Sequence, residues 1–174
     1  MCCCKALRKI SKSIGDSCMM KELMEIIIHC QPGVYVQGKH KGICMIPFTG
    51  ETSSPWFQGK VIGIGTDTQQ VMDGKITQLS ARYMLEGVDY AGQKCRVFVE
   101  NIGTDLENCH PTIVTDSGAL SAWEDMSLTA RVEGWEDGVK VHIFEEEASR
   151  ESLWRLMYQI NQAGVAPVES VMPA

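Results

Sequence analysis

The sequence lacks the motifs that most directly indicate a function. No apolar run approaches the roughly 18–20 residues of a transmembrane helix, and the longest, at residues 24–28, is far too short. There is no nucleophile elbow, phosphate-binding loop, zincin motif or dinucleotide fingerprint, since the glycines of residues 63–65 have no third glycine and no following helix. We therefore expect no membrane span and no cofactor.

The eight cysteines contain no CxxC pair, and their spacing fits neither a disulfide framework nor a zinc knuckle. His29-Cys30 and Cys109-His110 are adjacent pairs, whereas metal ligation needs residues that converge in space. We expect reduced thiols and no metal. No segment has the basic start, apolar stretch and cleavage site of a signal peptide, so a cytoplasmic protein is expected.

Positive charge is scarce outside the N-terminal segment. Residues 1–21 carry a net charge of +4, and the remaining residues carry −10. Binding to nucleic acid needs a basic surface that replaces counterions, so the acidic body argues against a nucleic-acid partner. The basic leader, 1–21, is expected to be a weak helix or a disordered, solvated segment.

The strongest structural signal is a predicted β-hairpin. Apolar and polar residues alternate in Ser80–Gly87 and again in Lys94–Asn101, and a loop containing Gly92 connects them. Further turns are predicted at Asp73-Gly74 and Asp137-Gly138. Segments spaced about 8–12 residues apart between such turns are typical of an antiparallel β-barrel or sandwich. We assign residues 22–147 to one all-β domain, with a surface loop at 50–55.

The C-terminal part, 148–174, has a different pattern. Ser149 can cap an amphipathic helix predicted over Arg150–Ala163. Its apolar side chains recur at helical spacing and form one stripe: Leu153, Trp154, Leu156, Met157 and Ile160. Such a stripe is expected to dock on the barrel or on a second copy of the chain, so a homo-oligomer is one possible assembly.

Several short motifs carry a resemblance to a known family. They run from Gly59 through Gly65–Asp67, Leu79–Tyr83 and Asn101–Gly103 to Pro111, Thr115, Gly118, Trp123 and Val139–Phe144. In these residues, within 42–146, the chain resembles a family of small uncharacterised bacterial and fungal proteins with a lipocalin-like antiparallel β-barrel. Two positions depart from the family pattern, with Ser80 in place of an Asp and Thr68 in place of an aromatic residue. The resemblance implies a concave barrel interior. It implies no particular reaction, because none is established for the family.

Three polar residues are candidates for the interior. Arg82 could grip a carboxylate or carbonyl of a ligand through two donors, or it could lie outside, paired with an acid across the ladder. Asp67 could be a barrel-mouth carboxylate facing Arg82, or a turn residue bonded to its own backbone. Asn101 could be a pocket amide or the residue that ends its strand.

Aromatic residues could line the same pocket, because small-ligand sites are mostly apolar with few polar groups. The candidates are Trp56, Phe57, Tyr83 and Trp123, and at least two of them are expected to be ordinary core residues. His142 alternates with Val141 and Ile143, so it could reach the interior or face water.

Three functions remain open on the sequence. The first is a barrel that binds a small, mostly apolar organic ligand, with Arg82 and Asp67 as polar anchors. The second is a cofactor-independent isomerase, cyclase or lyase, in which Arg82 stabilises negative charge and Asp67 or His142 moves a proton. The third is an oligomeric interaction module that uses a sheet edge or the C-terminal helix.

Overall fold

A computed structural model describes residues 20–146, and this part of the chain is almost entirely β-strand. Its nine strands and one 3₁₀ helix (η2) follow in the order β1 Lys21–Cys30, β2 Val34–Gln37, β3 Gly42–Ser53, β4 Phe57–Met72, β5 Lys75–Asp89, β6 Lys94–Gly103, β7 Cys109–Thr115, η2 Ser121–Glu124, β8 Leu128–Trp135 and β9 Gly138–Glu145. Most of the predicted leader, cysteines 2, 3, 4 and 18, and the predicted C-terminal helix lie outside the described residues.

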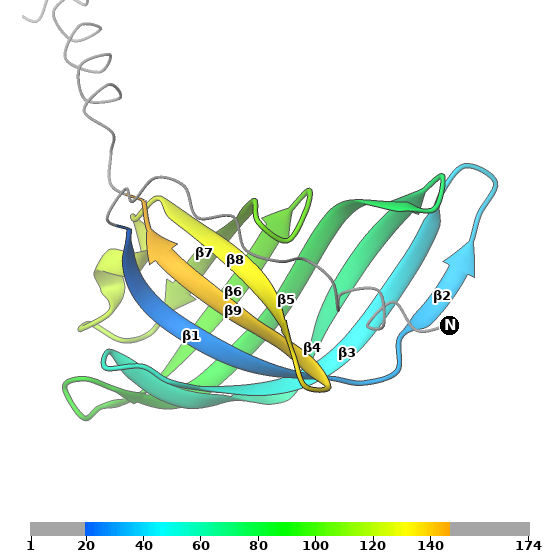
Figure 1. Cartoon of the computed structure of the whole chain (residues 1–174). Helices are drawn as coiled ribbons and strands as arrows, with labels where there is room; N and C mark the ends of the chain where they lie inside the picture. The colour runs from blue at the N-terminus through cyan, green and yellow to red at the C-terminus, as the bar shows by residue number, and fades with distance from the viewer. Residues whose placement is uncertain (1–19, 147–174) are drawn as a thin grey trace, which may run out of the picture.

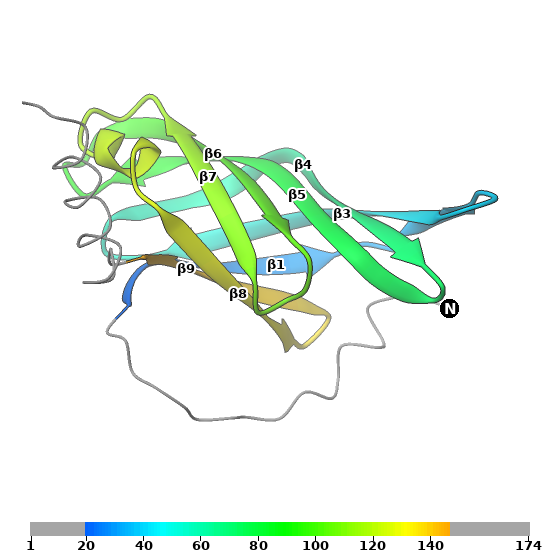
Figure 2. The same ribbon diagram turned by 90° about the horizontal axis from the view of Figure 1, so that it is seen from above.

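Eight of these strands form a closed antiparallel barrel. Each strand from β3 to β9 pairs with the next, and β1 completes the ring by pairing with β9 on one side and β3 on the other. β1 pairs with residues 48–52 of β3, whereas β2 pairs with residues 42–45 of the same strand. The β2–β3 ribbon therefore extends beyond the ring (Figures 1 and 2). The prediction of an all-β antiparallel barrel is confirmed.

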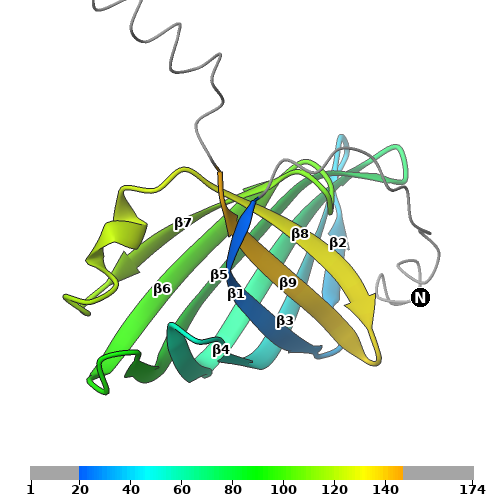
Figure 3. The same cartoon turned by 60° about the vertical axis from the view of Figure 1, so that its left-hand side comes forward.

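Large apolar side chains are buried at the end of the barrel where β1 begins. The stretch after β7 carries η2 to this end, where the helix lies beside β7 (Figure 3). Trp123 of this helix and Leu120, the residue before the helix, join Leu23 and Phe57 in the buried core cluster. Phe57 is 1% exposed and is the largest fully buried side chain of the described residues. This end of the barrel is filled with side chains.

The strands are longer than their sequence pattern predicts. The loop expected at 50–55 is wrong in part, because β3 continues to Ser53 and pairs with β4 up to that residue. β4 likewise runs through Gly63, where a bulge shifts its register and the backbone has φ of +65°. Glycine adopts this conformation without steric cost, so the strand can bend and continue around the barrel.

The connection between β5 and β6 is organised by one buried carboxylate. Asp89 is 6% exposed and accepts hydrogen bonds from the Ser117 hydroxyl at 2.6 Å and from the amides of Ala91 and Gln93, each at 2.9 Å. The bond from Ser117, followed by the backbone bonds, lowers the pKa of the Asp89 carboxyl below its usual 3.8. Ser117 precedes η2, so Asp89 ties the β5–β6 turn to the filled end.

Replacing Asp89 with alanine should lower the free energy of unfolding at pH 7. A carboxyl whose pKa is lowered by folding stabilises the protein above its unfolded pKa, and this contribution is lost as the pH falls through the folded value. The difference from wild type should therefore shrink between pH 7 and about pH 3 in denaturant unfolding. The exposed Asp125 provides a control, since Asp125→Ala should change little at either pH. A difference for Asp89→Ala that is equal at both pH values would contradict this role.

None of the residues from 20 to 146 forms a helix long and apolar enough to cross a membrane.

Candidate functional site: a polar cavity inside the barrel

A cavity of about 70 Å³ lies in the barrel, away from the filled end. Fifteen of the described residues line it, from all eight strands of the ring and the β6–β7 loop. Most are apolar: Ile28, Ile46, Phe48, Leu79, Ala81, Leu106, Val132, Val139 and Val141, with Cys30 and Cys109 beside them. The other four are polar, namely Asp67, Gln69, Tyr83 and Asn101. The cavity is thus an apolar enclosure with a small polar group of side chains.

The strand register explains why these polar residues meet. Asp67 on β4 pairs with Ala81 on β5, and Ala81 pairs with Asn101 on β6. The three residues form one row on the inner face of the sheet, and the small side chain of Ala81 leaves space between the two polar ones. Gln69 and Tyr83 each lie two residues along their strands, so they face the same interior.

Three buried atoms in this cavity have unused hydrogen-bonding capacity. They are Oε1 of Gln69, the hydroxyl of Tyr83 and Oδ1 of Asn101, and these are all the buried side-chain nitrogen and oxygen atoms of residues 20–146 that lack a hydrogen-bond partner. The three residues are only 5–6% exposed. Leaving one such group unpaired costs about 1–3 kcal/mol, and native proteins seldom leave buried polar groups in this state.

Asp67 places an ionisable group beside these atoms. Its Oδ2 accepts a hydrogen bond from Nε2 of Gln69 at 2.7 Å. Burial raises the pKa of the Asp67 carboxyl, although the Gln69 bond and a backbone bond from Ser80 act in the opposite direction. Asp67 also contributes to the raised pKa of the Cys109 thiol, about 11, which is caused first by burial and then by the nearby carboxylates, Asp105 foremost. The polar side of the cavity is therefore acidic.

The structure corrects the predicted role of Arg82. Its side chain is 65% exposed and forms an ion pair on the outer face, with Nη2 at 2.5 Å and Nε at 2.6 Å from Oε1 of Glu100. The two residues are directly paired across β5 and β6. Because side chains alternate along a strand, the inward Ala81 and Tyr83 force Arg82 outward. The alternative of a surface arginine paired across the ladder is the observed one, and the predicted Arg82–Asp67 pair is wrong.

Of the four aromatic candidates, only Tyr83 lines the cavity. Its ring packs edge-on against Phe48, with centroids 5.4 Å apart. Phe57 and Trp123 are buried in the core cluster, and Trp56 packs against that cluster and the ring of Tyr90. None of these three residues lines the cavity, and the alternative of an ordinary core residue, expected for at least two of the four, describes Phe57 and Trp123.

His142 faces the outside of the barrel, because Val141 and Ile143 on either side of it point inward. Its Nδ1 lies 2.9 Å from Glu22 and 3.8 Å from Glu25, and its Nε2 lies 3.5 Å from Glu133. Glu22, Glu25 and His142 could together hold a metal ion. Glu25 also has Lys140 at 3.5 Å, so a protein cation already balances part of this acidic group.

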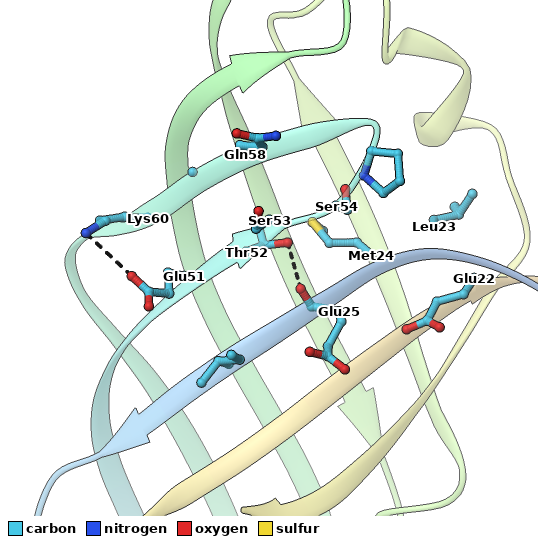
Figure 4. Close-up of a pocket in the computed structure, with 13 residues that line it drawn as sticks. Glu22, Leu23, Met24, Glu25, Glu51, Thr52, Ser53, Ser54, Gln58 and Lys60 are labelled. Atoms are coloured by element: carbon cyan, nitrogen blue, oxygen red, sulfur yellow. Dashed lines mark hydrogen bonds and ion pairs between the residues drawn. The ribbon is translucent and has the colours of Figure 1, made fainter.

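A wider groove of about 800 Å³ lies on the surface, where the beginning of β1 separates from the β3–β4 hairpin. Figure 4 shows that its charged side chains, Glu22, Glu25, Glu51 and Lys60, lie along its sides. Lys60 pairs with Glu51 at 3.5 Å, and Thr52 donates a hydrogen bond to the backbone oxygen of Glu25 at 2.6 Å. None of the three unpartnered buried atoms lies here, so the groove is the weaker candidate.

The sequence reasoning missed Gln69 and Cys109. Gln69 has the same strand phase as Asp67, which is the signal that could have identified it. The signal was weak because residues 65–70 read GTDTQQ and contain no apolar residue. Alternation of apolar and polar side chains, the usual guide to the inward face, is absent there.

Comparisons with known proteins agree with this fold. Residues 19–104 match the model of a family described as a protein of unknown function (DUF3237). A β-barrel-like protein from Acinetobacter baumannii superposes with a TM-score of 0.62 at 12% identity, covering 77% of this chain and 99% of that one. A protein of unknown function from Clostridium acetobutylicum gives 0.59 at 22% identity, covering 72% and 97%.

A structure described as an enzyme from Penicillium herquei gives a TM-score of 0.60 at 16% identity, covering 78% of this chain and all of that one. Sequence identities this low support a shared fold, and they do not support a shared function or shared site residues. None of the curated proteins matches this chain. The family match agrees with the resemblance noted in the sequence: residues 19–104 of this chain are similar to the DUF3237 family, whose function is unknown.

Proposed function

We propose that the barrel binds a small, mostly apolar organic molecule in the cavity around Tyr83 and Asn101. The observation that carries this proposal is the convergence of the unpartnered buried atoms on a single cavity. Buried polar atoms without partners that lay far apart would only destabilise the fold. A few polar atoms that face one apolar cavity are instead the usual composition of a small-molecule site. A ligand that bonded to these atoms would repay the cost of burying them.

The size of the cavity limits what enters it. Pockets for drug-sized ligands occupy about 300–1,000 Å³, so a cavity of about 70 Å³ holds the polar end of a ligand and a few carbon atoms. The remainder would extend between Leu106, Val132 and Val139, which supply an apolar wall from the β6–β7 loop and the β8–β9 hairpin. This geometry favours a slender molecule with one polar end.

Filling the cavity should abolish ligand binding without unfolding the barrel. Ala81→Leu would place three additional carbon atoms between Asp67 and Asn101, where the ligand head is expected. Native mass spectrometry of the wild-type protein, purified without denaturation, should show an additional small-molecule mass that Ala81→Leu lacks. Ala81→Val adds less volume to the cavity, so the fraction of this variant that carries the bound molecule should lie between those of wild type and Ala81→Leu.

Val114→Leu is the matched control, because it also adds apolar volume to a strand but at a position 56% exposed. It should carry the same bound mass as the wild type, and circular dichroism should give the same β spectrum for all variants. Equal bound mass in folded Ala81→Leu and wild type would place any ligand elsewhere. A wild-type protein that carries no additional mass from its native source, and takes none up from an extract of it, would contradict the proposal.

A cofactor-independent enzyme is the second candidate, and Asp67 is the observation that favours it. Burial raises the pKa of the Asp67 carboxyl, so it keeps its proton to higher pH than an ordinary aspartate, a property that suits a proton-transfer group. The Penicillium herquei structure, which has the same fold, is described as an enzyme. The native mass experiment distinguishes the two, since an enzyme would release the bound compound with an altered mass or chromatographic retention.

A further inference from the structure

We infer that the polar end of the ligand is a protonated primary amine, held by Asp67, Gln69, Tyr83 and Asn101. This inference rests on the proposed function, because it concerns the same cavity. It specifies the chemical class that the cavity selects, which neither the family nor the structural relatives indicate.

The first step is the hydrogen-bonding capacity of the cavity. Nε2 of Gln69 donates to Asp67, which orients the Gln69 amide so that its free atom, Oε1, is an acceptor. The free atom of Asn101 is also a carbonyl oxygen, and the Tyr83 hydroxyl oxygen can accept as well. The cavity therefore presents several acceptors to one small volume, and a ligand group must supply donors.

The second step compares the groups that could supply those donors. An ammonium group has three donors and no acceptor, so it can bond to three of these oxygens at once. A hydroxyl group has a single donor and would leave acceptors unpaired at a cost. A carboxylate has no donor, so it could accept only from the Tyr83 hydroxyl and would place its other lone pairs against the carbonyl oxygens of Gln69 and Asn101. The donor count thus ranks an amine first, an alcohol second and a carboxylate last.

The third step is charge. The fifteen described residues that line the cavity include Asp67 but no lysine, arginine or histidine. Asp105 and Glu107, on the loop beside the cavity, act on the Cys109 thiol in the same sense as Asp67. An ammonium group would be attracted by this field, and charge interactions are stronger in a largely apolar enclosure than in water. Arg82, which could have served an anionic ligand, lies on the outer face with Glu100.

The test uses four small probes that share a butyl chain: n-butylamine, 1-butanol, butyrate and butyltrimethylammonium. The last keeps the positive charge but has no donor. Each would be titrated into the full-length protein at pH 7, and binding followed by the side-chain amide signals of Gln69 and Asn101 in ¹H–¹⁵N spectra. Butylamine should bind at least about tenfold more tightly than butanol, because it pairs more acceptors and the charge. Butyrate and butyltrimethylammonium should be the weakest.

Asp67→Asn isolates the charge, because it keeps the size of the side chain. It should weaken the binding of butylamine by about tenfold or more. The affinity for butanol should stay within about threefold of the wild-type value. Glu100→Gln is the matched control, since it removes an acidic charge from the outer face of the same sheet and should change neither affinity. If butyrate or butanol bound as tightly as butylamine, or if Asp67→Asn had no effect on butylamine, the amine inference would be overturned.

The two proposals can fail separately. If no probe moves the Gln69 and Asn101 signals while native mass spectrometry detects a bound molecule that Ala81→Leu excludes, the amine inference is wrong and the proposed function stands. If neither experiment detects binding at the cavity, both are wrong. Tight butylamine binding lost in Asp67→Asn would support both.

Discussion

Replacing Phe57 with alanine is expected to lower the free energy of unfolding by about 3–5 kcal/mol, the usual cost of truncating a buried phenylalanine. The side chain is 1% exposed and belongs to the buried core cluster, which also includes Leu120 and Trp123. Its removal takes away apolar burial and leaves a void that Leu120 and Trp123 cannot fill without moving. Equilibrium unfolding in denaturant measures the effect directly.

The same variant tests the division of the barrel into a filled end and a cavity. Val114→Ala removes an apolar side chain from an exposed position and should stay within about 0.5 kcal/mol of wild type. The folded fraction of Phe57→Ala should still retain ligand, because Phe57 does not line the cavity. A loss of less than about 1 kcal/mol, or a selective loss of ligand from folded protein, would contradict this division.

The second large effect is expected at Tyr83, where stability and binding should change in opposite directions. Burial raises the pKa of the Tyr83 hydroxyl, which keeps it neutral, and the group has no partner in the described part of the chain. Tyr83→Phe removes this unpaired group with little change in shape, so the ligand-free protein should gain about 1–3 kcal/mol of stability. The same change should weaken ligand binding by about tenfold, since one hydrogen bond to the ligand is lost.

Much of the fold could be predicted from local patterns. The hairpin at Asp73-Gly74 forms as expected, with positive φ at both residues, and the alternation in β5 and β6 correctly identified the inward faces. The turn at Asp137-Gly138 was placed one residue late, because Glu136 and Asp137 make the turn and Gly138 begins β9. A Cβ atom on Gly138 would lie 1.8 Å from the backbone oxygen of Ile28, so glycine serves strand packing there.

The candidate site was harder to predict, because it depends on register between strands. Period-2 alternation places a residue inside or outside, but it does not reveal that Asp67, Ala81 and Asn101 share a row. That row depends on the bulge near Gly63, which shifts the pairing of β4 with β5. Arg82 was misassigned because its chemistry suited a ligand, although its strand phase already indicated the outer face. The 3₁₀ helix was missed because four residues are too few to show a helical period.

The measurement that tests the central claim most directly is the free energy of unfolding of Tyr83→Phe compared with that of Tyr90→Phe. Both proteins would be refolded from denaturant and dialysed so that no ligand remains. The Tyr90 hydroxyl donates to the backbone oxygen of Ala119 at 3.2 Å and the residue is 57% exposed, so its removal should cost up to about 1 kcal/mol. Tyr83→Phe should instead be more stable than wild type. A loss of stability in both variants would show that the Tyr83 hydroxyl is already satisfied inside the barrel, and would contradict a cavity whose polar groups are reserved for a ligand.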